Sequence, residues 1–127
     1  LQEGQPRPDN LLSFYPWSPR ELLLAPQIDG MALYRKQLLE RIGGFDTEME
    51  VHAVAGWEDY ELWLHILQEG AEVQFLPDLI GQYRRHPQSM LSETNAETYY
   101  LATYLRRRYE RLVRAYGLGE PCLGSPV

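Results

Sequence analysis

Apolar side chains in the middle of the chain recur every three to four residues, which is the spacing of one face of an α-helix. The clearest pattern begins at Glu58 or Asp59 and runs to Glu69, with Gly70 placed to end it. This periodicity predicts an amphipathic helix of about three turns. Its expected apolar face consists of Leu62, Trp63, Ile66 and Leu67.

Two short helices are expected before this one. Ser18 is a typical N-cap, and Pro19 is suited to the first helical position, so a helix should begin there and end before Pro26. A second helix is predicted over residues 36–42, where Gly43 and the glycine after it provide a left-handed stop.

A long final helix is predicted to start after Ser92 or Thr94 and to reach Tyr116, with Gly117 as its stop. Leucines and tyrosines at helical spacing form its apolar side. They are Leu101, Leu105, Leu112 and Tyr116, with Tyr104, Tyr109 and Val113 beside them.

Short strands are expected at residues 28–34, 72–76 and 79–84, where β-type residues alternate between turn residues. They are too few and too separated to close a sheet, and their unpaired edges need partners. The missing part is therefore expected upstream of Leu1, or a second copy of the chain covers the edge as a homodimer.

The predicted fold class is α/β, mostly helices with a few short strands. We divide the chain into a lead-in with a short helix (1–27), a central part (28–92), and a C-terminal long helix with a tail (93–127).

Composition narrows the class of protein. The chain has 127 residues, enough for one modest domain, and 44% of them are hydrophobic, as in globular proteins. A net charge of −6 does not favour general nucleic-acid binding. Cys122 is the single cysteine, so no internal disulfide forms, which fits a reducing compartment such as the cytoplasm. No apolar run approaches the roughly 20 residues that span a bilayer.

Two adjacent carboxylates, Glu58 and Asp59, lie where a glycine-led loop becomes the central helix. The backbone N–H groups and the positive end of a helix stabilise an acid at this position. A carboxylate held there beside a cleft has the chemistry of a general base. An acidic first turn is also ordinary helix chemistry, so the pair alone leaves both interpretations open.

Four motifs in a fixed order add context to this pair. They read ALYRK, IGGFD, GWEDYELW and YRRHPQSM, at residues 32–36, 42–46, 56–63 and 83–90. In this order and spacing they resemble the C-terminal half of a family 2 glycosyltransferase with the GT-A fold. The resemblance covers about half of the chain. It implies a partial GT-A, Rossmann-like domain that transfers a sugar, with inversion, from a nucleotide-sugar donor to a sugar or lipid-linked acceptor.

The resemblance also implies roles for individual residues. Asp59 occupies the position of the catalytic base, and Glu58 would orient the site or bind the acceptor. Trp57 would offer its face to a sugar ring. These roles place the acceptor at the start of the central helix, where we expect the helix N-terminus to keep the pKa of Asp59 low enough for its carboxylate to be ionised at working pH.

The diphosphate side of the reaction is implied by the fourth motif. Arg84 and Arg85 would contact the diphosphate, and His86 would bind either it or a divalent metal, Mn²⁺ or Mg²⁺. The Asp-x-Asp metal motif of the family is absent from this sequence. The nucleotide-binding half is absent as well, so we expect the fragment alone to be inactive.

Alternatives from other classes remain open. One is a non-catalytic carbohydrate-binding module, and another is an interaction or assembly segment built on the final helix. Residues 93–116 carry five Arg and three Glu, net +2, which leaves −8 for the rest of the chain. Such a helix can make peripheral contact with an anionic membrane. A solvated face with local pairs such as Glu110 with Arg114 is the preferred interpretation.

Overall fold

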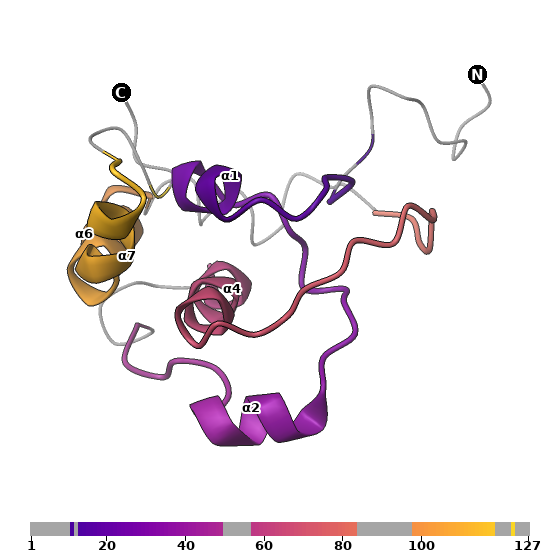
Figure 1. Ribbon diagram of the computed structural model, residues 1–127, viewed down its shortest axis with the longest axis horizontal. Coiled ribbons are helices and arrows are strands. Elements are labelled where there is room, and N and C mark those ends of the chain that lie inside the picture. Colours follow the sequence, from indigo (N-terminus) through magenta and orange to yellow (C-terminus); the bar gives the residue numbers. More distant parts are fainter. Residues whose placement is uncertain (1–10, 12, 50–56, 84–97, 119–122, 124–127) are drawn as a thin grey trace.

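The computed structural model describes residues 11, 13–49, 57–83, 98–118 and 123, and Figure 1 shows the helices that they form. In chain order these are α1 (Pro19–Leu24), α2 (Lys36–Ile42), α4 (Glu58–Gln68), α6 (Thr98–Arg108) and α7 (Glu110–Ala115).

The local signals at α1 and α2 are confirmed. Ser18 Oγ accepts the Glu21 N–H at 3.3 Å, and Pro19 is the first residue of α1. Gly43 ends α2 with φ of 84°, a left-handed conformation in which an L side chain is strained. The boundaries of both helices therefore follow from capping chemistry in the sequence.

Helix α4 is the centre of the core. Its predicted face is confirmed at Leu62, Trp63 and Ile66, but Leu64 and Glu61 on other sides are fully buried too. Helix α1 packs against it, and the Tyr60 hydroxyl donates to the Leu22 carbonyl at 2.6 Å. In Figure 1, α4 lies between α1 above and α2 below, with α6 and α7 to one side. The helix is surrounded, rather than amphipathic on a surface.

The predicted single C-terminal helix is wrong in one respect. Where the structure describes it, it consists of two helices that separate at Tyr109, which has φ of −113° and ψ of 29°. The Tyr109 side chain is 2% exposed and turns toward α4, where its hydroxyl meets Glu61. Burying that ring against α4 thus coincides with the break. The glycine stop at Gly117 is confirmed, with φ of 65°.

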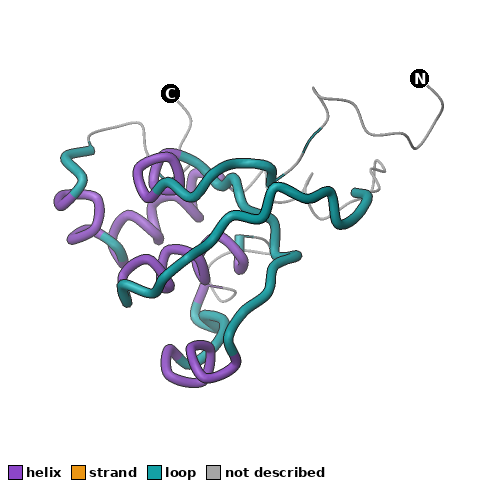
Figure 2. Tube along the Cα trace, turned by 45° about the vertical axis from the view of Figure 1, so that its right-hand side comes forward, coloured by secondary structure: helices purple, strands orange, loops and turns teal. Residues whose placement is uncertain are grey.

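The predicted α/β fold class is wrong for the part of the chain that the structure describes. Residues 28–34, 72–76 and 79–83 form no strand, and no sheet is present among the described residues, so a Rossmann-like GT-A domain is not shown. Figure 2 draws these segments as loop. The physical reason is pairing: alternation predicts a half-buried strand only when a neighbouring strand takes its hydrogen bonds.

These loops leave large apolar side chains in solvent. Leu33 is 94% exposed and Ile80 is 72% exposed. Other side chains of these segments, Ile28, Ala32, Tyr34 and Val73, pack against the core, so the segments bury part of their apolar surface as loops. The two segments touch, because a Cβ added to Gly81 would lie 3.0 Å from Met31 Cε. Within the described residues, no helix has both the length and the apolar character needed to cross a membrane.

Candidate functional site

Asp59 lies in the first turn of α4, against the loop that precedes α2. Its Oδ1 accepts the N–H of Tyr60 at 2.8 Å. Gly30 is next to it: a Cβ built there would be 3.7 Å from Asp59 Cβ and 3.9 Å from Oδ2. Because Gly30 has no side chain, one side of the Asp59 carboxylate has space for a small group.

The environment of Asp59 makes it a stronger base than a free aspartate. Burial raises its pKa, and the negative charges of Glu58 and Asp29 raise it further, against the lowering effect of the backbone N–H of Tyr60. Desolvation thus outweighs the backbone donors, and the pKa lies above its ordinary value. The expectation that Asp59 is ionised at working pH stays a prediction. A carboxylate with a raised pKa binds a proton more readily, as a general base requires.

Tyr34 shares this environment. Burial raises the pKa of its hydroxyl, and the charges of Asp59 and Asp29 add to the rise, so the hydroxyl stays protonated. The hydroxyl lies 3.5 Å from the carbonyl oxygen of Gly30, and the ring packs on Trp63 with centroids 5.4 Å apart. Asp29 holds the loop by accepting the Met31 N–H at 2.7 Å. Asp59 at the start of α4 thus has a second acid, Asp29, and the protonated hydroxyl of Tyr34 nearby.

Trp57 is the residue before α4, and its backbone has φ of 61°, a left-handed conformation that is uncommon outside glycine. Its ring meets the edge of Tyr60 with centroids 5.5 Å apart. Trp57 and Glu58 are half-buried. The structure therefore brings the predicted residues Trp57, Glu58 and Asp59 together at one helix start, with an aromatic beside the acids.

The other predicted site residues, Arg84, Arg85 and His86, lie outside the described residues. So does Cys122. The described part of the chain contains no group of three or more His, Cys, Asp or Glu residues placed to hold a metal ion. The donor set for Mn²⁺ or Mg²⁺ that the resemblance implies is therefore not found there, and we derive no chemical step through a metal.

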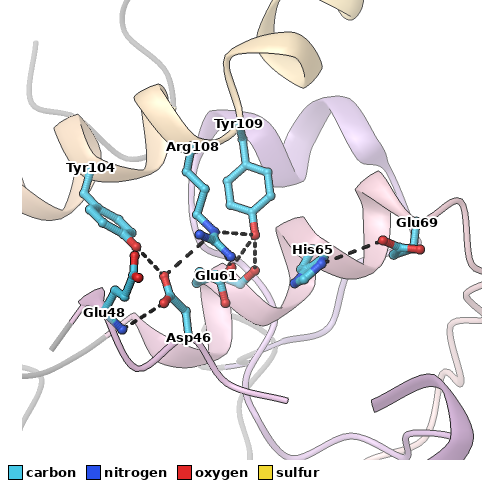
Figure 3. A network of polar contacts seen from close by, with 8 residues as sticks. All are labelled: Asp46, Glu48, Glu61, His65, Glu69, Tyr104, Arg108 and Tyr109. Carbon is cyan, nitrogen blue, oxygen red and sulfur yellow. Dashed lines mark hydrogen bonds and ion pairs between the residues drawn. The ribbon is translucent and has the colours of Figure 1, made fainter. Parts of the chain in front are cut away.

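A second polar cluster, not predicted from sequence, joins α4 to the C-terminal helices (Figure 3). Glu61 is 0% exposed; its Oε1 accepts from Arg108 Nε at 3.2 Å and from the hydroxyl of Tyr109. Arg108 Nε also lies 3.8 Å from Asp46 Oδ2, which accepts the Tyr104 hydroxyl at 2.6 Å. We call these five residues the Glu61 cluster.

Burial, neighbouring charges and hydrogen bonds all shift pKa values in the Glu61 cluster. Burial opposes the charge of Arg108, but Tyr109, Asp46 and Glu61 outweigh that effect and raise its pKa. Burial and the hydrogen bond to Asp46 raise the pKa of Tyr104 to about 12. Burial and the bond to Glu61 raise the pKa of Tyr109. The two phenols therefore remain donors and the guanidinium remains charged across neutral pH.

Sequence reasoning found only part of this cluster. Asp46 belongs to the second sequence motif, and its Oδ1 accepts the Glu48 N–H at 2.9 Å. Glu61 reads as another acid of an ordinary first turn, and Arg108 reads as one of five arginines on a solvated helix. The available signal was the run Leu62-Trp63-Leu64 directly after Glu61, because three consecutive apolar residues point to most sides of a helix and indicate burial beyond one face.

The remaining arginines fit the solvated interpretation. Arg114 pairs with Glu110 at 2.7 Å, as predicted, and Arg107 and Arg111 are exposed. The arginines of α6 and α7 therefore have two kinds of surroundings, because Arg108 pairs with the buried acid Glu61 whereas Arg107, Arg111 and Arg114 are exposed.

A polar hollow of about 260 Å³ opens beside the Glu61 cluster. The turn after α2 forms one wall, and His65 of α4 with Arg108 of α6 forms the other. It is distinct from the Asp59 surroundings, because Gly30, Tyr34 and Trp57 do not line it. The side chains that shape it are Phe45, Asp46, Thr47, Glu48, His65 and Arg108.

No protein-family model, curated protein or solved structure matches the chain. Function is therefore inferred from its own residues and their geometry.

Proposed function

We propose that this chain is the acceptor-side part of an inverting glycosyltransferase that uses a nucleotide-sugar donor. The observation that carries the proposal is the half-buried carboxylate of Asp59, whose pKa is raised, at the start of α4. The order of the four sequence motifs supports it, since their second acid falls on this residue. The 127-residue chain alone is expected to be inactive, because it lacks the nucleotide-binding half.

The reaction requires one proton transfer from the acceptor. Asp59 takes the proton of the acceptor hydroxyl as that oxygen attacks the anomeric carbon of the donor sugar. The new C–O bond forms as the bond to the diphosphate oxygen breaks, and the nucleoside diphosphate leaves with the electron pair. A general base of this kind contributes typically 10²–10⁴-fold to rate.

Neighbouring residues would orient the acceptor. Glu58, next to Asp59, would accept a second acceptor hydroxyl, and the half-buried ring of Trp57 would face the sugar ring. Tyr34 supplies a protonated hydroxyl beside the base. Arg84 and Arg85 would contact the diphosphate and His86 a divalent metal; these three roles rest on the sequence motif alone.

The proposal also covers partners and location. We place the chain in the cytoplasm, since a single cysteine needs no oxidising compartment. Exposed Arg107 and Arg111 would permit peripheral contact with an anionic membrane that holds a lipid-linked acceptor. The exposed apolar side chains of residues 31–33 and 76–83 favour a covering partner, such as a second copy of the chain.

The test is release of nucleoside diphosphate by a longer parent protein that contains this sequence, with a panel of nucleotide sugars and Mn²⁺ or Mg²⁺. We expect Asp59→Asn to lower kcat by at least about 100-fold while donor binding survives. Glu69→Gln, an exposed acid at the other end of α4, is the matched control and should keep turnover. Unchanged turnover in Asp59→Asn would refute the assignment of the base.

A non-catalytic carbohydrate-binding module is the second candidate. The polar hollow beside the Glu61 cluster favours it, because it lies on the chain apart from Asp59 and has the mixed donors and acceptors that sugars require. A parent protein that binds sugars but never releases nucleoside diphosphate would favour this candidate over the transferase.

A further inference from the structure

The hollow beside the Glu61 cluster has walls from three parts of the chain. The turn after α2 contributes Phe45, Thr47 and Glu48, α4 contributes His65, and α6 contributes Arg108. Its volume of about 260 Å³ lies just below the range of about 300–1,000 Å³ that holds drug-sized ligands. The space therefore suits a ligand about the size of one sugar ring.

The described residues do not fill the open side of this hollow. A Cβ built on Gly43 or Gly44 would meet no described atom within 4 Å. Phe45 lines the hollow and is 57% exposed, so its ring is accessible to a ligand. The space in front of the turn is thus accessible from solvent.

Arg108 presents donors to this space. The hydrogen bonds and ion pairs that it makes with Glu61, Tyr109 and Asp46 all use Nε, and its Cζ lies 5.8 Å from the centre of the Tyr109 ring. Because the guanidinium is planar, these contacts fix the direction of its two Nη nitrogens, which take no part in them. The Arg108 side chain keeps 36% of its surface exposed. His65 adds an imidazole that is 18% exposed, with Nε2 3.8 Å from Glu69.

Charge selects against ionic ligands. Asp46 and Glu48 carry two negative charges on the lining, and Arg108 already neutralises buried Glu61, so an oxyanion gains little. A metal ion is disfavoured as well, because the described residues hold no group of three suitable ligands. A neutral ligand with many hydroxyls remains: Arg108 and His65 donate, Glu48 accepts, and Thr47 does both.

We infer that this hollow is a binding subsite for a neutral pyranose ring, stacked on Phe45 and hydrogen-bonded by Arg108, His65 and Glu48. Its assignment to a sugar of the acceptor rests on the proposed function. The subsite lies outside the base at Asp59, so it would hold a sugar unit other than the one whose hydroxyl reacts. An acceptor longer than one sugar is thus the expected substrate class.

The experiment is an NMR titration of the 127-residue chain with methyl glycosides of glucose, galactose, mannose and N-acetylglucosamine. We expect saturable shifts of the His65 imidazole and Phe45 ring signals, with a dissociation constant on the order of millimolar for one sugar. Phe45→Ala should weaken binding about fivefold, the scale of one lost aromatic contact. Tyr99→Ala removes an equally exposed aromatic from α6 and should leave binding unchanged.

Three outcomes would overturn the subsite. They are an absence of saturable shifts with every glycoside, binding that Phe45→Ala does not weaken, and saturation of the same signals by inorganic phosphate or Mn²⁺ in place of sugars. The chain with Asp59→Asn should bind as tightly as the unmodified chain, which separates this inference from the proposed reaction. Sugar binding here without turnover by the parent protein would refute only the transferase; turnover without these shifts would refute only the subsite.

Discussion

Removing one hydroxyl from the Glu61 cluster should have a large effect on stability. Tyr109 is 2% exposed, and its hydroxyl donates to Glu61 Oε1 and accepts from Arg108 Nε at 3.4 Å. Tyr109→Phe preserves the ring and removes only the hydroxyl. We therefore expect the substitution to destabilise the fold through the loss of hydrogen bonding to a buried carboxylate.

The magnitude follows from the contacts that remain. A hydrogen bond to a charged group contributes about 1.5–3 kcal/mol. Glu61 Oε1 keeps Arg108 Nε at 3.2 Å, so we expect a value in the middle of that range, about 2 kcal/mol. At roughly 2.1 cal/mol/K per residue, 127 residues give an unfolding entropy of about 0.27 kcal/mol/K, and the expected fall in Tm is about 7 °C.

The assay is urea unfolding followed by far-UV circular dichroism, with thermal melts alongside. Tyr100→Phe is the matched control, because Tyr100 is 64% exposed and its substitution should change stability by less than about 0.5 kcal/mol. A Glu61→Leu background completes the double-mutant cycle. In that background Tyr109→Phe should cost little, since the hydroxyl has lost its carboxylate; an equal cost in both backgrounds would refute the reasoning.

Two further predictions concern the carboxylate of Asp59 and the exposed apolar loops. Burial raises the pKa of Asp59 above its unfolded value, so the ionised carboxylate costs folding free energy above that pKa, and the cost vanishes as the pH falls below it. Asp59→Asn should therefore raise the urea midpoint at pH 7, with a gain that shrinks toward acid pH; a gain that grows on acidification would contradict this. Leu33 and Ile80 are 94% and 72% exposed, so the chain should self-associate as its concentration rises in sedimentation velocity. Leu33→Lys with Ile80→Lys should shift it toward monomer by at least about tenfold in dissociation constant, and a monomeric unmodified chain would remove the basis for this prediction.

Capping and periodicity predicted the helices well because both are local. Ser18, Gly43 and Gly70 fix helix ends through their own backbone and side-chain chemistry, so the boundaries of α1, α2 and α4 could be placed from sequence. The strands could not, because pairing is non-local: residues 72–76 alternate correctly, but the described structure provides no neighbouring strand for them.

The candidate site was likewise predictable where its residues are adjacent in sequence and unpredictable where they are far apart. Trp57, Glu58 and Asp59 are adjacent in sequence, so their meeting at one helix start was predictable. Glu61 and Arg108 are 47 positions apart, and nothing in the local pattern of either indicates the other. The direction of the Asp59 pKa shift was missed for the same reason, since it depends on burial by the loop around Gly30.

The surrounded position of α4 has a consequence for amide hydrogen exchange. Buried on nearly every side, α4 opens only when the core opens, so its amides belong to the slowest-exchanging unit. Helix α2, with no buried side chain, belongs to a unit that opens at little cost. Asp59 is carried by the slow unit, whereas the part of the turn wall at Gly43 and Gly44 follows the fast one, up to Asp46, which the Tyr104 hydroxyl ties to α6. The molecule can thus admit a ligand at that wall without disturbing the position of the base.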